Sequence, residues 1–167
     1  MTGEPRDRIG AARLVASGFD GFTALDWLRK TDASVTGALA AWDQGELVEV
    51  TVGTAWDVVR LPRALGWKTV QTMRHAGTPV GPAQHTPDGV EVLVPVGSAA
   101  EWHLPDAEVL AEGALVAVPH PATVAPRTQQ GHSWIVSPQE NGPLTDADLL
   151  HEAYAAALAA AHMDTAR

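Results

Sequence analysis

The sequence predicts an α+β domain with a mixed central sheet of about five strands, flanked by helices. Three observations predict this fold: apolar residues at helical spacing near both ends, alternating apolar and polar residues in the middle, and Gly or Pro between these runs. With 167 residues, 46% of them hydrophobic, the chain can bury one core. We expect a helical region at 1–46, an α/β core at 47–138 and a C-terminal amphipathic helix at 145–163.

The N-terminal region shows three stretches with helical spacing. Residues 6–17 carry apolar side chains at this spacing and are followed by a glycine that can end a helix. Residues 22–30 place apolar side chains on one stripe, which predicts a second helix. Asp32 or Ser34 can cap a third helix that carries Trp42.

The core begins where the apolar spacing changes from helical to alternating. Residues 47–53 and 56–62 lie on either side of a Gly-Thr break, which predicts a strand pair or hairpin. An amphipathic helix follows Pro62 and can end at Gly77. Further strands, separated by turn-rich segments and loops, are predicted at 90–96, 114–119 and 132–138.

The C-terminal helix opens with Thr145-Asp146-Ala147-Asp148, which resembles a capping box with Thr145 as the cap and Asp148 at the third helical position. Alanines along this helix permit close approach of another helix. It can therefore dock on its own domain, or bind a partner or a second copy of the chain.

Composition excludes several classes of protein. Twenty acidic and eleven basic residues give a net charge of −9, which argues against general affinity for nucleic acid. The absence of cysteine excludes disulfides and thiolate metal sites. No apolar run reaches the roughly 20 residues of a membrane span, and the first residues lack a signal-peptide core, so we expect a cytoplasmic protein without a membrane partner.

The order of motifs across Val50–Pro138 carries a family resemblance. VTVGT comes first, then WDVVRLPRALG, an amphipathic helix, GTPVGPAQHTPDGVEVLVPVG and finally GHSWIVSP. In this order the stretch resembles the bifunctional DNA primase/polymerase N-terminal domain family, in particular its small, divergent actinobacterial members. The resemblance implies a mixed α/β fold related to archaeo-eukaryotic primases, with the active site on one face of a sheet.

The resemblance also implies that the metal ligands of this family are replaced. Its Asp-x-Asp pair would fall on Arg60 and Pro62, its histidine near Val92 and its late aspartate near Ala125. None of these side chains binds a cation, whereas the reaction needs carboxylates that hold divalent metal. The expectation is a pseudoenzyme without a cofactor, in which Mg²⁺ or Mn²⁺ has a role only if the domain is active after all.

The predicted function is a degenerate primase/polymerase-like domain that binds an unidentified protein or self-associates, in a regulatory role. The face predicted for this contact comprises Asp57, Arg60, Glu91, Arg127 and His132. One alternative is an active nucleotidyl transferase or nucleotide-binding enzyme whose carboxylates come from Asp57, Asp88 and Glu91. Another is a nucleic-acid binder without catalysis.

The remaining candidate groups have ordinary structural interpretations as well. His85, His103 and His120 could converge with Asp88 or Asp106 on a metal, although ordinary surface and loop histidines are the favoured interpretation. The cations Arg60, Arg63, Arg74 and Lys68 could bind phosphate, or Arg60 could pair with Asp57 or Glu91. Core packing is the interpretation for most of the six tryptophans, and Trp67 and Trp102 are the candidates for a contact surface.

Overall fold

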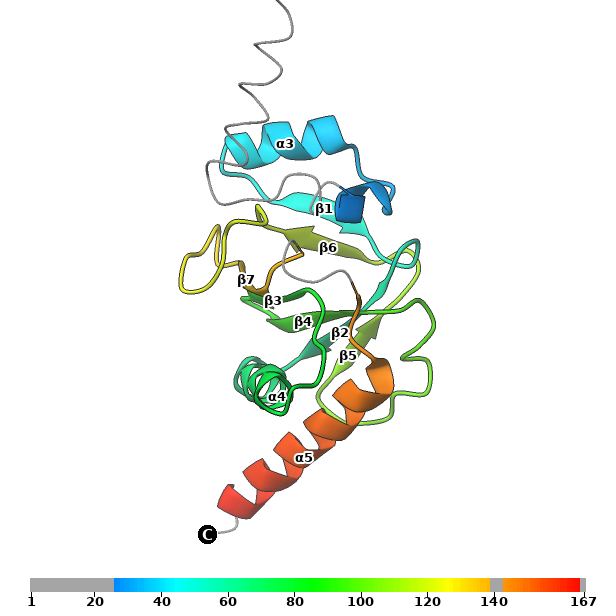
Figure 1. Cartoon of the computed structure of the whole chain (residues 1–167), viewed down its shortest axis with the longest axis vertical. Helices are drawn as coiled ribbons and strands as arrows, with labels where there is room; N and C mark the ends of the chain where they lie inside the picture. Colours follow the sequence, from blue (N-terminus) through cyan, green and yellow to red (C-terminus); the bar gives the residue numbers. More distant parts are fainter. Residues whose placement is uncertain (1–25, 139–142, 166–167) are drawn as a thin grey trace, which may run out of the picture.

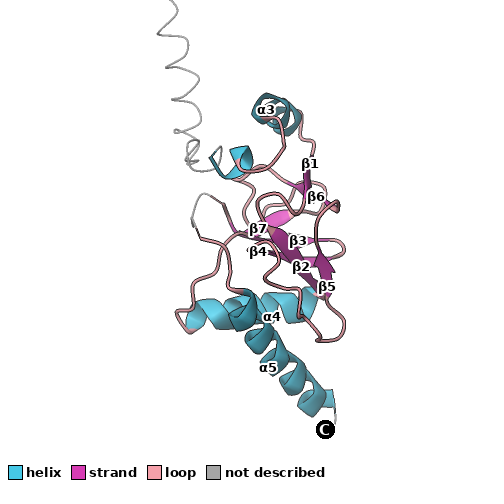
Figure 2. Ribbon diagram, turned by 90° about the vertical axis from the view of Figure 1, so that its right-hand side faces the viewer, coloured by secondary structure: helices cyan, strands magenta, loops and turns pink. Residues whose placement is uncertain are grey.

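Two antiparallel sheets and the helices that cover them form successive layers (Figure 1). The computed structural model describes residues 26–138 and 143–165. The small sheet pairs β1 with β6 and lies between α3 and the large sheet, whereas α4 and α5 cover the opposite face of the large sheet (Figure 2). The large sheet has the order β5-β2-β4-β3-β7. The elements are α3 (Val35–Asp43), β1 (Val48–Thr51), β2 (Asp57–Leu61), α4 (Arg63–His75), β3 (Ala83–Thr86), β4 (Gly89–Val94), β5 (Glu108–Leu110), β6 (Leu115–Val118), β7 (Ser133–Val136) and α5 (Ala147–Thr165).

The predicted α+β class, with a five-stranded sheet and flanking helices, is confirmed. The sheet is not mixed, however, because every pair of neighbouring strands is antiparallel. The predicted hairpin between β1 and β2 is also wrong: β1 pairs with β6, whereas β2 pairs with β4 and β5. Gly53, at a φ of 103°, begins the turn that takes the chain from one sheet to the other.

Gly53 has a second reason to lack a side chain. A Cβ on Gly53 would lie 2.4 Å from the Cα of Glu112, on the segment that leads into β6. The backbone of Val52 continues the pairing there, since its N–H donates to the Ala114 carbonyl and its carbonyl accepts from Gly113. The close approach therefore commits β1 to β6 rather than to β2.

The N-terminal predictions are tested only from residue 26 onward. Residues 26–29 are helical, within the predicted helix at 22–30. Ser34, one of the two predicted caps, caps α3 by accepting a hydrogen bond from the N–H of Gly37 at 3.1 Å. The helix predicted over 6–17 lies outside the described residues.

The C-terminal helix is confirmed, with a different cap from the one predicted. The Asp146 carboxylate accepts from the N–H groups of Asp148 and Leu149, so Asp146 caps α5. The buried Thr145 hydroxyl instead accepts from the N–H of Gly81. The helix docks on α4 within its own domain, and Tyr154 donates from α5 to the Pro105 carbonyl. Among the described residues, no helix combines the length and apolar character that a bilayer crossing requires.

Strands β3 and β5 were not predicted. β3 contains the polar residues Gln84 and His85, and its first residues follow a run of Pro and Gly that reads as a turn. β5 has only three residues and lies at the edge of the sheet. Both are short strands that exist because longer neighbours pair with them, which a single-sequence pattern does not show.

The large sheet separates two hydrophobic cores. One core lies under α4 and α5 and includes Val59, Val92 and Tyr154. The other lies between the large sheet, the small sheet and α3, and most of the tryptophans are there. Trp27, Trp42, Trp56 and Trp134 are buried in this second core, as predicted for most of the six.

Candidate functional site

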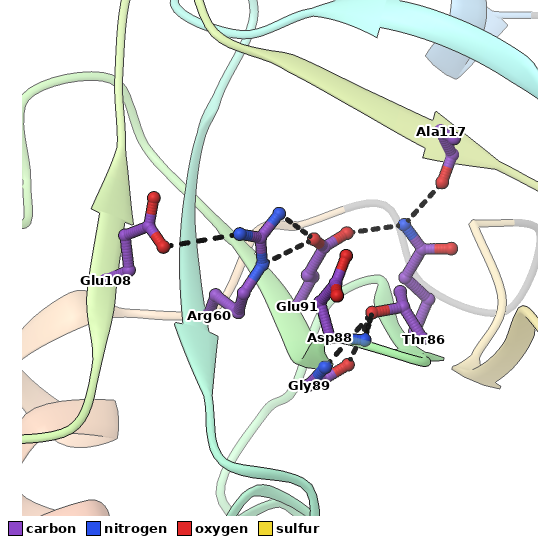
Figure 3. A network of polar contacts seen from close by, with 8 residues as sticks. Arg60, Thr86, Asp88, Gly89, Glu91, Glu108 and Ala117 are labelled. Carbon is purple, nitrogen blue, oxygen red and sulfur yellow. Dashed lines mark hydrogen bonds and ion pairs between the residues drawn. The ribbon is translucent and has the colours of Figure 1, made fainter.

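A row of polar side chains crosses the large sheet on the face that looks toward the small sheet. The strand register places Glu108 opposite Arg60, Arg60 opposite Glu91, and Glu91 opposite Gln84. The row thus runs through β5, β2, β4 and β3 at one level of the sheet. Figure 3 shows Arg60 between Glu91 and Glu108.

Glu91 is the centre of this row, and both of its carboxylate oxygens are engaged. Oε2 accepts from Arg60 Nη2 at 2.7 Å and from Nε at 2.9 Å. Oε1 accepts from Gln84 Nε2 at 2.8 Å, and the same Nε2 donates to the Ala117 carbonyl of the small sheet at 2.9 Å. The side chain of Glu91 is 4% exposed, so its charge depends on these partners rather than on water.

Arg60 is held in its charged form. Burial acts to lower the pKa of Arg60, but the hydrogen bond and the charge of Glu91, together with the charges of Glu108 and Asp88, outweigh burial and raise this pKa above its ordinary value. The contact with Glu108, at 3.3 Å, lies at the exposed edge strand. One of the interpretations of Arg60 considered from the sequence, an ion pair with Glu91, is therefore confirmed.

Asp57 does not join this row. Residues 57 and 60 are three apart on β2, so their side chains leave opposite faces of the sheet, and the neighbours of Asp57 on its own face belong to the core under α4 and α5. The buried Asp57 carboxylate accepts from the N–H of Gly97 at 2.8 Å. Its position fixes the turn that follows β4.

The three carboxylates of the enzyme alternative are therefore not brought together. Asp57 lies on the helix-covered face, Glu91 lies on the other face, and the exposed Asp88 lies in the turn between β3 and β4. In residues 26–138 and 143–165, no group of three or more His, Asp or Glu side chains has the arrangement of a metal site. Arg60 and Val92, two positions that the resemblance equates with metal ligands, also lie on opposite faces.

Arg127 and His132 belong to the loop between β6 and β7. Arg127 is exposed, and no described residue forms an ion pair with it. His132 is half-buried, and its charge contributes to the lowered pKa of His85. Of the five residues predicted to form one face, the structure joins only Arg60 and Glu91 by hydrogen bonds.

Trp67 lies on α4, half-buried, and donates from Nε1 to Nδ1 of His85 on β3 at 2.8 Å. Because Nδ1 accepts this hydrogen bond, a neutral His85 carries its proton on Nε2. Burial, then the charges of Arg63 and His132, lower the pKa of His85 below its ordinary value of 6.5. The pair fixes one flank of α4 to the sheet.

Trp102 lines a surface cleft of about 250 Å³ between the loop after β4 and the first turns of α5. Its ring meets His151 edge-on at 4.8 Å and stacks against Tyr154 at 6.0 Å. His103 lies beside His151, with 4.5 Å between the ring centroids. Trp102 therefore anchors α5 while part of its surface remains at the cleft.

The histidines considered for a common metal site lie in separate surroundings. His85 contacts Trp67, His103 contacts His151, and His120 contacts Trp42. Burial lowers the pKa of His120. Sequence reasoning missed Gln84, Glu108 and His151. The period of two along β4 does predict that Glu91 and Val92 lie on opposite faces of the sheet.

The proposed phosphate cluster is divided between two faces of the sheet. Arg60 belongs to the polar row, whereas Arg63 and Arg74 project from α4 on the other side.

Comparison with protein-family models, with curated proteins and with solved structures found no match for this chain.

Proposed function

We propose that this chain is a non-catalytic, primase/polymerase-like domain that works by binding another protein. The observation that carries the proposal is the complete engagement of Glu91 by Arg60 and Gln84, with Asp57 on the opposite face of the sheet. Metal-dependent nucleotidyl transfer needs carboxylates that reach the same ion. Here the acids of the core hold strands and a turn in place instead.

Two surface features support a role in binding. Trp67 and Trp102 are both half-buried, and Trp102 borders a cleft in which side chains from two separate segments meet. The helix α4 also carries Arg and Lys side chains and contains no acidic residue. Aromatic and arginine side chains in partly exposed positions are enriched in protein interfaces.

Nucleotide incorporation tests the non-catalytic part of the proposal. The full chain is supplied with primed and unprimed templates, nucleoside triphosphates, and Mg²⁺ or Mn²⁺. We expect no more incorporation than with the Asp57→Ala variant, with Glu108→Gln as a control at an exposed position. Incorporation by the natural sequence that Asp57→Ala abolishes, while circular dichroism shows both proteins folded, would establish an active enzyme and refute the proposal.

A further inference from the structure

We propose that the flank of α4 that carries Arg63 and Arg74 binds an acidic segment of the partner protein. The inference rests on the proposed function and adds to it a surface and the chemistry of the partner. We refer to the stripe formed by Arg63, Trp67, Gln71 and Arg74 as the α4 stripe. These residues follow one another at spacings of four, four and three, so they lie along one side of the helix.

The charge of α4 is opposite to that of the chain. The helix carries Arg63, Lys68 and Arg74 and no acidic residue, in a chain with a net charge of −9. In the described parts of the chain, neither Arg63 nor Lys68 forms an ion pair, and Arg74 makes one long contact, from Nη1 to the Ile135 carbonyl at 3.4 Å. The three side chains thus keep donors available for an anionic partner.

Helix stability does not explain this distribution. Arg63 lies in the first turn of α4, next to the positive end of the helix dipole, and no side chain caps that end. A cation in this position destabilises a helix, whereas Arg74 and His75 in the last turn stabilise it. The stability of the helix therefore accounts for Arg74 but not for the positive charge of Arg63 at the other end of the stripe.

The α4 stripe lies on the side of α4 nearest β3 and β7, and Arg63, Gln71 and Arg74 are exposed there. Trp67 contacts His85 on β3, and Arg74 reaches the carbonyl of Ile135 on β7. At its C-terminal end, Gln71, Arg74 and His75 line a hollow of about 300 Å³. All three of these side chains can donate hydrogen bonds, which suits a carboxylate.

The spacing of the two arginines favours a protein segment with separated acids. Arg63 and Arg74 are eleven residues apart, which is about 16 Å along the helix axis. An extended peptide covers this distance in about five residues. A nucleic acid would bring a continuous row of phosphates toward a chain of net charge −9, so repulsion opposes it more strongly than it opposes a segment with two separated acids.

Fluorescence anisotropy with a labelled synthetic peptide tests the inference. The probe carries two glutamates about five residues apart around a leucine, and the comparison probes are the same peptide with glutamine for glutamate and an oligothymidine of similar length. We expect the full chain to bind the glutamate peptide in preference to both. Arg63→Glu and Arg74→Glu should each weaken binding about tenfold, because each removes a charge-assisted contact and adds repulsion.

Lys30→Glu is the matched control, since Lys30 is exposed and belongs to the segment packed on the opposite side of the large sheet. It carries the same change of charge and should leave the affinity within about twofold, as expected for a distant, screened charge. Arg63→Glu places an acid at the start of α4, where it favours the helix, so folding is retained.

Three results would overturn the inference: equal binding of the glutamate and glutamine peptides, equal weakening by Lys30→Glu and Arg63→Glu, or tighter binding of the oligothymidine. Each of these would leave the non-catalytic proposal standing, because that proposal depends on the incorporation assay.

Discussion

Arg60 and Glu91 face each other across β2 and β4, with Nη2 of the arginine 2.7 Å from Oε2 of the glutamate. The glutamate is buried, and the arginine side chain is 24% exposed. Because Glu91 also binds Gln84, which in turn binds the Ala117 carbonyl, this pair links the large sheet to the small sheet. The Arg60–Glu91 pair therefore stabilises the contact between the two sheets.

Removing Arg60 should therefore cost more than an ordinary surface substitution. Arg60→Met leaves the Glu91 carboxylate buried without a cation, and we expect a loss of about 3 kcal/mol in the free energy of unfolding. Arg60→Met combined with Glu91→Leu should cost less than Arg60→Met alone, since no charge then remains buried. Urea unfolding at neutral pH measures the free energy of unfolding of the natural sequence, of Arg60→Met and of the double variant.

Glu108→Gln is the control for this series, because its side chain is 61% exposed. It should change the free energy of unfolding by less than about 1 kcal/mol. A cost for Arg60→Met no greater than that of Glu108→Gln would show that the row does not hold the two sheets together.

A second prediction concerns the contact of α4 with β4. A Cβ on Gly66 would lie 2.5 Å from the Cβ of Val90, so Gly66→Ala should destabilise the protein by about 1–3 kcal/mol through overpacking. Gly37→Ala in α3 is the matched control, since its Cβ meets Ser34 at an ordinary 3.4 Å and should stabilise the helix by up to about 1 kcal/mol. Thermal unfolding of the two variants should show shifts of opposite sign.

The start of α5 gives a third prediction. Asp146→Ala removes the acceptor for the N–H groups of Asp148 and Leu149 and should cost about 1 kcal/mol. Thr145→Val leaves the N–H of Gly81 without its hydroxyl partner and should cost about 1–3 kcal/mol. Amide exchange distinguishes them: Asp146→Ala should accelerate exchange in the first turn of α5, whereas Thr145→Val should do so at Gly81. The reverse pattern would restore Thr145 as the cap.

The fourth prediction is the protonation of His85. The pKa of His85 is lowered by burial and then by the charges of Arg63 and His132, so the folded state favours the neutral ring. The neutral His85 ring contributes fully to the stability of the folded state above the ordinary pKa of about 6.5. This contribution is lost as the pH falls through the lower pKa of the folded state. His85→Gln should therefore reduce the drop in unfolding free energy between neutral and mildly acidic pH.

Nitrogen NMR provides the direct check on this ring. At neutral pH, Nδ1 of His85 should have the chemical shift of an unprotonated nitrogen, because it accepts from Trp67. A protonated Nδ1, or a pH dependence that is identical in His85→Gln, would contradict the arrangement.

Periodic patterns predicted those parts of the fold in which many residues repeat the same spacing of apolar side chains. The helices α4 and α5, the strands β4, β6 and β7, and the burial of most tryptophans all follow from such patterns. β3 could not be predicted in this way, because Gln84 is buried only through its contacts with Glu91 and with Ala117, a residue 33 positions away. Its environment is created by tertiary pairing.

The candidate face shows the same limit. The sequence analysis assigned Asp57 and Arg60 to one face, which is wrong. A period of two along β2 places them on opposite sides of the sheet, and this period can be read from the sequence. The alignment of Arg60 with both Glu91 and Glu108 depends on the register of three strands. No spacing within a single strand reveals such a register.

Titration with Mn²⁺, followed by amide NMR in the presence of a nucleoside triphosphate, tests the central claim most directly. If the carboxylates of Asp57, Asp88 and Glu91 serve the fold and its turns, paramagnetic broadening should not concentrate on β2, β4 or the turn between β3 and β4. Broadening confined to those segments at low metal concentration, and removed by Glu91→Gln, would contradict the account.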